Sequence, residues 1–547
     1  MSLPCHRADA RRFRNDILVR AAVSAMLALL CGFAAAPASA AGPGEAQFDV
    51  PMVASWKNTT QFYANNATQP VVAGDTVFFA AGTKLYAADL ATGATKWQYP
   101  PDVKLDSEIQ TTPAVSDSVV YFVAGDALYA LNAADGKPRW PAYRTRSGIV
   151  TAPFIIDKTI YFGSDEGRIY GLDTATGNPV NGIYGRGAAA GTDFSCDIVL
   201  SADTFYYISG FMDLHAMNSR TGLPRWTVRL PSTTHDNALP VLDGDLVLVA
   251  AGNTLVGFRT NHGEQRLYVP LPTDACTPPA VDGRGNIYII TADLKVYALD
   301  RSGRGLWRKA AEVDDEPIAQ PIVANGVLLV GTSQGKLYAF DTATGATRWI
   351  YQFQPSAASA SAIPEFTNVG SSPVLVGGTL LVLTDDGSLT AFRHDLTDKM
   401  PPVISDIEPK LGAYINGRPP VKFAARITDD GCGLDPGSVT LKIDDQLVPR
   451  RPPGDENDDK PGFDFFTADN TLEYYTVDTE TGRSNAFPDG HHTVTVSARD
   501  WMGNVGSKSW TFTVDDSIKK VTSKPGRRGR GGLGGRAGGR GGGLSPR

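Results

Sequence analysis

"LYAFDTATGATRW" occupies residues 337–349, and nearly the same thirteen residues, "LYAADLATGATKW", occupy residues 85–97. The two copies lie 252 positions apart, which is six periods of 42. Similar phrases, such as "LYALN", "IYGLD" and "VYALD", occur between them. Short segments rich in Val, Ile, Tyr and Phe, separated by Gly and Asp turns at this period, predict units of four β-strands.

Eight such units can be traced along the chain. Each unit opens with an apolar triplet, and in seven units the triplet follows a proline: Pro70, Pro113, Pro153, Pro240, Pro279, Pro321 and Pro373. The remaining unit, residues 199–226, fits without the proline. The β-branched alternation excludes helical solenoids of similar period. Four-stranded sheets repeated in this way predict an all-β protein with an eight-bladed β-propeller.

The repeated turn suggests how neighbouring blades hold together. In the first copy, Asp89 and Thr92 can bond turn amides, and Gly93 can take a positive φ. Trp97 then projects a large ring that we expect to pack against a neighbouring blade. The predicted docking residues are Trp56, Trp97, Trp140, Trp226, Trp307 and Trp349, with the turn glycines Gly93, Gly136, Gly177, Gly222 and Gly345.

This pattern resembles the tryptophan-docking repeat of the pyrroloquinoline-quinone (PQQ)-like, BamB-type eight-bladed propellers. The resemblance covers roughly residues 50–396. Blade three has Asn181 at the tryptophan position and blade five has Leu267, which puts docking there in doubt. The eighth unit ends at Arg393 without its outer strand. Because Trp56 precedes Trp97 by 41 residues, we expect residues 50–58 to complete blade eight within a propeller spanning residues 41–396.

The first forty residues have the order of a secretory signal peptide. Five arginines precede the apolar run 21–36, which ends at the small-residue site Ala38-Ser39-Ala40, and we expect cleavage after Ala40. The Arg11–Arg12 pair leaves twin-arginine export open, and Cys31 leaves a lipid anchor open. No later stretch reaches the ~20 apolar residues of a membrane span. The sequence therefore predicts an exported protein that is periplasmic, secreted or associated with the cell surface.

Two further regions follow the predicted propeller. Residues 397–402 form a Pro-containing linker, and residues 403–516 alternate as expected for a β-sandwich. The segment "DGHHTVTVSARDWMGN" resembles bacterial immunoglobulin-like modules. Residues 517–547 carry nine Lys or Arg and no acid, with almost no large apolar residue, so we expect a disordered tail. The formal net charge is −7 overall and −19 for residues 41–516 alone.

Several short segments match motifs that carry chemistry in other proteins. Ser333 in "GTSQG" joins two predicted strands, whereas a nucleophile elbow joins a strand to a helix. Asp455, Asn457 and Asp459 alternate like a calcium loop but lack its Gly and Glu positions, which favours a solvated turn over a loose calcium site. A bond between Cys196 and Cys276 stays open, although equivalent positions two blades apart lie far from each other. Because none of these motif matches meets all the requirements of its chemistry, the sequence predicts no catalytic, cofactor-binding or metal-binding residue.

Two functions from different classes fit these features. The preferred interpretation is a non-catalytic, BamB-like scaffold that binds envelope or extracellular proteins, without PQQ or calcium. The alternative is a PQQ-dependent dehydrogenase of alcohols or sugars, although the chain lacks the adjacent Cys-Cys pair of related enzymes and any C-x-x-C-H haem motif. The basic tail predicts contact with anionic polymers, while the oligomeric state stays open. The tail arginines are Arg527, Arg528, Arg530, Arg536 and Arg540.

Overall fold

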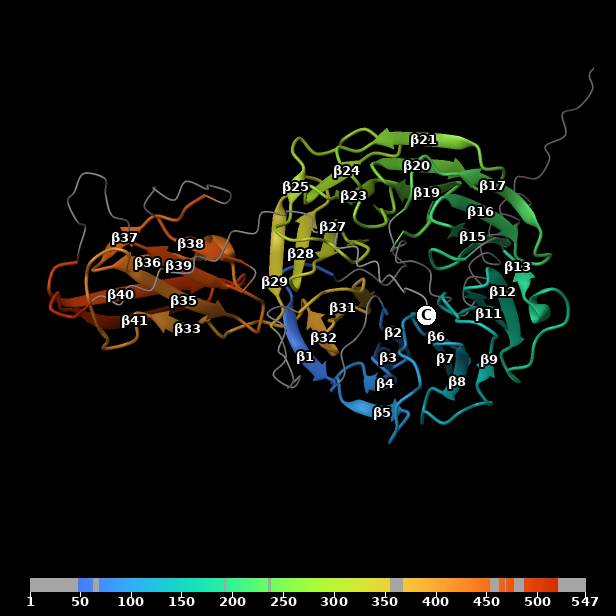
Figure 1. Cartoon of the computed structure of the whole chain (residues 1–547), viewed down its shortest axis with the longest axis horizontal. Helices are drawn as coiled ribbons and strands as arrows, with labels where there is room; N and C mark the ends of the chain where they lie inside the picture. The colour runs from blue at the N-terminus through green and yellow to red at the C-terminus, as the bar shows by residue number, and fades with distance from the viewer. Residues whose placement is uncertain are drawn as a thin grey trace, which may run out of the picture.

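The computed structural model describes residues 48–61, 68–190, 193–234, 238–354, 367–452, 462–467, 469–476 and 487–519. These residues form β-strands and two short 3₁₀ turns, η1 (Tyr184–Arg186) and η2 (Pro436–Ser438), with no α-helix among them. The fold class is therefore all-β, as the sequence predicted. Eight four-stranded antiparallel sheets stand around a common centre, and a separate pair of sheets lies beside them (Figure 1).

Seven of the eight sheets are built from consecutive strands. The innermost strand comes first and the outermost last. Blades one and two contain β2 (Val71–Ala73), β3 (Thr76–Ala81), β4 (Lys84–Asp89), β5 (Thr95–Tyr99), β6 (Ala114–Ser116), β7 (Val119–Ala124), β8 (Ala127–Asn132) and β9 (Tyr143–Arg144). Blades three and four contain β10 (Phe154–Ile156), β11 (Thr159–Ser164), β12 (Arg168–Asp173), β13 (Ala188–Ala189), β14 (Val199–Ser201), β15 (Thr204–Ser209), β16 (Asp213–Asn218) and β17 (Pro224–Arg229). Blades five to seven contain β18 (Val241–Asp243), β19 (Leu246–Ala251), β20 (Thr254–Arg259), β21 (Gln265–Pro270), β22 (Ala280–Val281), β23 (Ile287–Thr291), β24 (Lys295–Leu299), β25 (Ala311–Glu312), β26 (Ile322–Ala324), β27 (Val327–Gly331), β28 (Lys336–Asp341) and β29 (Thr347–Gln352).

The second strand of each blade explains why the blades stack. In β3, β7, β15 and β19 every residue is buried, because neighbouring blades cover both faces of the sheet. These strands are continuous apolar runs such as "TVFFAA" rather than alternating ones. Outer strands such as β5 and β17 instead show mixed exposure, since one side faces solvent. Burial of these runs is the main driving force for ring assembly.

The two ends of the propeller sequence meet in blade eight. This sheet has the order β1–β32–β31–β30, built from β30 (Val374–Val376), β31 (Thr379–Leu383), β32 (Ser388–Arg393) and β1 (Val53–Thr59). β1 runs antiparallel to β32, and Trp56 lies opposite Ala391. The N-terminal strand thereby supplies the outer strand that the last unit lacks, which leaves no open sheet edge at β32.

The second module is a pair of sheets around one apolar core. One sheet has the order β33–β35–β39–β38 and the other β34–β41–β40–β36–β37. Phe423, Leu441, Val496 and Phe512 are among its fully buried residues. This arrangement is a β-sandwich, while its immunoglobulin-like character remains a prediction. The strands are β33 (Val403–Glu408), β34 (Tyr414–Ile415), β35 (Lys422–Thr428), β36 (Thr440–Ile443), β37 (Gln446–Val448), β38 (Asp464–Phe466), β39 (Thr471–Tyr475), β40 (Gly490–Arg499) and β41 (Val505–Val514).

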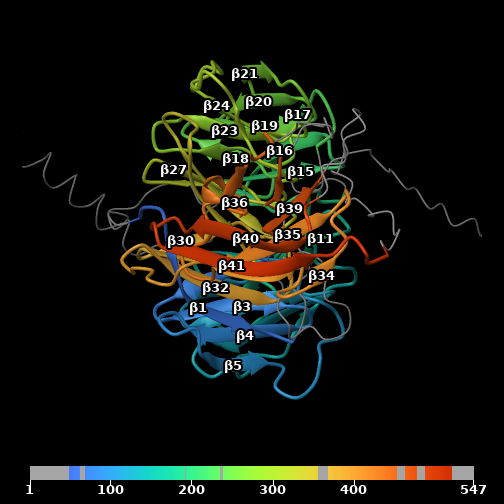
Figure 2. The ribbon, with the colours of Figure 1, turned by 90° about the vertical axis from the view of Figure 1, so that its left-hand side faces the viewer.

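The sandwich is docked on the rim of the ring. Figure 2 looks onto its outer end and shows it in front of the rim, between strands of blades seven and eight. Trp501 Nε1 donates to the carbonyl of Ile350 at 2.9 Å, and Arg426 donates to Gln354 Oε1 at 2.5 Å. Ala54 N in β1 donates to Gly431 O at 3.1 Å. The outer strands β29 and β1 are therefore covered by the same chain rather than left as edges.

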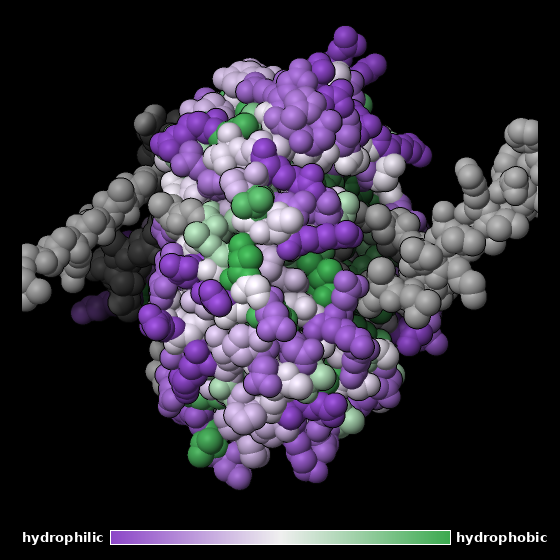
Figure 3. Space-filling view, turned by 90° about the vertical axis from the view of Figure 1, so that its right-hand side faces the viewer, coloured by the Kyte–Doolittle hydropathy of each residue, from purple (hydrophilic) through white to green (hydrophobic). Residues whose placement is uncertain are grey.

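The face of the ring opposite the sandwich is mostly polar. Figure 3 shows it as predominantly hydrophilic, with apolar residues scattered singly. Among the described residues, none belongs to a helix of the length and apolarity that crossing a bilayer would take. The predicted signal peptide (1–40), the calcium-like turn at Asp455, Asn457 and Asp459, and the tail arginines lie outside the described residues.

Candidate functional site

The repeated turn is held by the side chains that the repeat places there. Asp89 Oδ1 accepts hydrogen bonds from the Thr92 backbone N–H at 3.0 Å and from its hydroxyl at 2.9 Å. The same pair of contacts occurs at Asp173 with Thr176 and at Asp341 with Thr344. The bond from the Thr92 hydroxyl is the main cause that holds the pKa of Asp89 below its usual value. Each turn therefore presents a fixed carbonyl and a fixed glycine to its neighbour.

In five of the eight blades, a tryptophan side chain connects the blade to the turn of the following one. Trp97 Nε1 donates to Ala133 O in blade two at 2.9 Å, and Trp307 Nε1 donates to Thr342 O in blade seven at 2.9 Å. The same contact closes the ring, because Trp56 Nε1 of blade eight donates to Leu90 O of blade one at 3.1 Å. The remaining pairs of this kind are Trp140 with Thr174 and Trp226 with Thr260.

The turn glycines lie directly under these rings. Gly136 has φ +69°, and a Cβ added there would lie 2.7 Å from Trp97 Cε3. Gly345 has φ +76° and the same relation to Trp307 at 2.8 Å. Trp56 covers Gly93, Trp140 covers Gly177, and Trp226 covers Gly263, which the sequence reasoning missed although it ends the turn of blade five. These positions require glycine for two reasons: the backbone has a positive φ, and the tryptophan ring approaches too closely for a Cβ.

Gly136→Ala should lower the free energy of unfolding by about 2 kcal/mol or more, since the new Cβ is strained at positive φ and collides with Trp97. Chemical denaturation of the purified protein measures this loss. Gly74→Ala is the matched control, because Gly74 also has positive φ (+61°) but nothing lies within 4 Å of its added Cβ. Equal losses in the two variants would show that ring contact contributes nothing.

Blades three and five replace the tryptophan in different ways. At blade three, Asn181 does not fill the slot; the η1 turn instead carries Ile183 over Gly222, and Tyr184 OH donates to Asn218 O at 3.2 Å. The aromatic residue three positions after Asn181 was the available signal for this substitute. At blade five, Leu267 and Val269 lie beside Gly303 without a polar contact from either side chain.

Trp349 has a partner outside the propeller. Its side chain is fully buried between Tyr351 and Phe392 of blade eight. Its Nε1 donates to Cys432 O in the sandwich at 2.7 Å, rather than to a turn of blade eight. The segment after β32 lacks the Asp-x-x-Thr-Gly pattern, so the loop at residues 429–433 takes the place of that turn. The sandwich thus continues the interlocking series around the ring.

An ion cluster forms a second connection between the modules. Lys336 is buried in blade seven and pairs with Asp314 and, at 3.5 Å, with Asp315. Its Nζ also donates to Thr467 Oγ1 of the sandwich at 2.8 Å, and both Tyr338 OH and Thr467 Oγ1 donate to Asp314. Burial raises the pKa of Asp315 to about 6. Burial opposes ionisation of Asp314 as well, but Lys336 and the hydroxyl donors outweigh it and lower the pKa of that group.

A central cavity of about 400 Å³ lies at the centre of the ring. Its lining comes from seven blades and is mainly apolar or neutral. Asp197 is the one acidic residue among the described lining residues, which include no Arg, Lys or His. Cys196 lies beside Asp197, but burial raises the pKa of its thiol to about 12, so it stays protonated and is a poor nucleophile. Cys196 and Cys276 are both free thiols.

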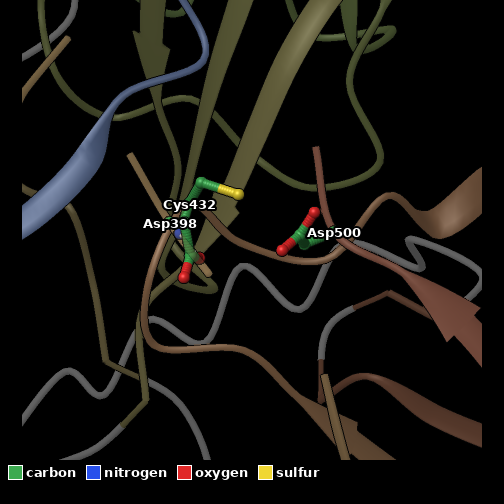
Figure 4. A group of neighbouring side chains, drawn as sticks. All are labelled: Asp398, Cys432 and Asp500. Atoms are coloured by element: carbon green, nitrogen blue, oxygen red, sulfur yellow. The ribbon is translucent and has the colours of Figure 1, made fainter. Parts of the chain in front are cut away.

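A buried group of Asp398, Cys432 and Asp500 lies where the linker meets the sandwich (Figure 4). Their ligand atoms lie within 4.8 Å of one another. However, Asp398 accepts the Cys432 and Met400 amides at 2.8 and 2.9 Å, and Asp500 accepts those of Met502 and Asn504. Burial raises the pKa of Cys432, which keeps its thiol protonated. These hydrogen bonds favour one interpretation, a turn that orients the sandwich, and they disfavour a metal site.

The fold and these contacts define a class: a β-propeller whose four-stranded blades interlock through turn-bound side chains. The family model described as "Outer membrane protein assembly factor BamB" matches residues 54–195, 181–264 and 210–403, more than half of the chain. The chain belongs to this family.

Individual relatives are more distant. The outer membrane protein assembly factor BamB of Burkholderia pseudomallei (strain K96243) is 30% identical over 155 residues, covering 28% of this chain and only 39% of the relative. The crystal structure of BamB from Moraxella catarrhalis has 17% identity and a TM-score of 0.50, covering 62% of this chain and 99% of that one. It shows the fold alone. A europium-containing methanol dehydrogenase reaches a TM-score of 0.46 at 15% identity over 65% of this chain and 85% of that one, a level that carries no argument.

Proposed function

We propose that this protein is an exported, non-catalytic scaffold that binds protein partners of the cell envelope. Membership of the BamB family supports this role. The observation that carries it is the continuous interlocking of blades and sandwich, in which buried aromatic and charged side chains connect the modules instead of converging on a reacting centre. Rigid bodies of this kind present loops and outer surfaces in fixed relation, which lowers the ordering cost of binding.

The central cavity does not fit PQQ. That quinone is a tricarboxylate and calls for cationic partners around its acid groups, whereas the described lining offers one carboxylate, neutral donors such as Gln69 and Gln320, and no cationic side chain. Calcium takes ~6–8 oxygen ligands, usually including several carboxylates, and the described lining has one carboxylate, Asp197. The dehydrogenase alternative therefore receives no support from this site.

Purified protein incubated with PQQ and calcium should not reduce an artificial electron acceptor in the presence of alcohols or aldoses. The lining of the central cavity gives the physical reason, since the quinone's carboxylates would face Asp197 without a counter-charge. Dye reduction measured against a boiled sample checks this expectation. Robust reduction that depends on substrate would replace the scaffold by a dehydrogenase.

We also propose that the tail, residues 517–547, binds anionic polymers. Its nine positive charges should bind by counterion release, which is insensitive to sequence and falls steeply with salt. Full-length protein should therefore be retained on heparin at low ionic strength, and a chain ending at Asp516 should elute earlier. Arg527, Arg528, Arg530, Arg536 and Arg540 replaced together by Gln provide the matched control of equal length. Equal retention of all three proteins would place the binding surface elsewhere.

A further inference from the structure

One position of the repeat forms a ring around the central cavity. In every blade, the residue two places before the innermost strand occupies an equivalent site. Seven of these eight residues are neutral, and the eighth is the carboxylate Asp197 of blade four. The full set is Gln69, Thr112, Ala152, Asp197, Leu239, Pro278, Gln320 and Ser372. Six of them line the cavity. Blade four is also the unit without the proline, so the carboxylate and the altered entry to the strand occur together.

The Asp197 carboxylate is held in place but not neutralised. Its Oδ1 accepts the Ala152 N–H of the neighbouring blade at 2.6 Å, which fixes the direction of the group. No Lys, Arg or His pairs with it among the described residues, and none belongs to the described lining. The side chain of Asp197 is exposed to the cavity. The surrounding protein partly desolvates its carboxyl group, which raises the pKa of that group. A cation would therefore meet a charge that solvent screens only in part.

Apolar surface surrounds this carboxylate. Phe211 is 36% exposed and Val150 is 42% exposed at the cavity, although both are residue types that normally bury their side chains. Phe194 and Ile318 add further apolar lining. A cavity of about 400 Å³ lies within the usual size range of small-molecule sites. The strongly acidic body should also concentrate cations at this opening.

We propose that the central cavity binds a small organic cation, whose ammonium group pairs with Asp197 and whose apolar body lies against Phe194, Phe211 and Ile318. The ligand class is a primary amine attached to an apolar group. The pairing combines one charge-assisted hydrogen bond with burial of the apolar part, so neither a simple metal ion nor a neutral alcohol meets both requirements. This site is independent of the scaffold role, because envelope partners do not need the cavity.

The experiment compares three probes of the same shape by titration calorimetry with the full-length protein. Phenethylamine is the cation, 2-phenylethanol the neutral analogue and 3-phenylpropionate the anion. We expect phenethylamine to bind about tenfold or more tightly than the alcohol, with the anion weakest, and its affinity to fall with added salt. Equal affinities for amine and alcohol, or no binding of the amine at millimolar concentrations, would overturn the proposal.

Two variants assign the effect to one carboxylate. Asp197→Asn keeps an oxygen for the Ala152 amide but removes the charge, so amine affinity should fall about tenfold, to that of the alcohol. Asp165→Asn is the control, since Asp165 is exposed on the neighbouring blade and does not line the cavity. Its affinity should remain that of the parent. If both variants lose the same affinity, the general field of the acidic body binds the amine and the specific site is wrong. Thermal unfolding verifies that both variants are folded.

Discussion

Trp349→Ala should lower the free energy of unfolding by about 3–5 kcal/mol, among the largest effects of any single substitution in the chain. Trp349 is completely buried: its relative exposure is 0%, and it packs against Tyr351 and Phe392. Its loss also leaves Cys432 O without the indole donor at the junction with the sandwich. Chemical denaturation followed by intrinsic fluorescence measures the change.

Two controls separate packing from coupling of the modules. Trp349→Phe retains most of the apolar contact but removes the hydrogen bond to Cys432, and should cost clearly less than the alanine variant. Trp97→Ala removes a ring of the same type between blades one and two, remote from the sandwich. Limited proteolysis should release the sandwich from the Trp349→Ala protein and not from the Trp97→Ala protein. Identical digestion patterns would contradict the role of Trp349 as a connection between modules.

Lys336→Met should destabilise the protein by about 3–5 kcal/mol, because it removes the cation between two carboxylates. Asp315 is buried beside Lys336, and Asp314 bonds to Thr467 across the junction. Without the ammonium group, both carboxylates lose their counter-charge, so the loss should be larger at pH 8 than at pH 5, where Asp315 takes up a proton. Equilibrium denaturation at the two pH values provides the measurement.

The sign of this pH effect follows from the direction of the shift. Burial raises the pKa of Asp315 to about 6 from an ordinary value of 3.8, so ionisation of this group disfavours the folded state as pH rises between those values. The double variant Lys336→Met with Asp315→Asn removes one carboxylate together with the cation and should recover part of the loss. If Lys336→Met alone is as stable as the parent protein at pH 8, the ion cluster does not contribute to the stability of the fold.

The fold was predictable because its signals are local and repeated. The 42-residue period, the apolar triplets and the turn with Gly93 and Trp97 each specify one strand or turn of a blade, and repetition makes them redundant. The placement of β1 beside β32 also follows from spacing, since an outer strand is absent after Arg393 and Trp56 lies one unit before Trp97.

The less local features could not be predicted in the same way. The indole of Trp349 meets Cys432 across 83 residues and between two modules, and no repeat relates those segments. Thr467 joins the Lys336 cluster from 131 residues away for the same reason. Tyr184 was missed because the η1 turn displaces the aromatic ring from the position counted along the repeat. Asp197 was available in the sequence, but its meaning depends on comparing one ring position across all eight blades.

Cross-linking of the intact protein in its native cell envelope, followed by capture and mass spectrometry, tests the scaffold role most directly. The account predicts recurrent cross-links between propeller residues and a small, reproducible set of envelope proteins. These links should persist in a chain ending at Asp516, because the propeller and not the tail carries them, and they should weaken in the Trp349→Ala variant. Recovery of the protein without partners, at the level of an exported control protein, would contradict the account.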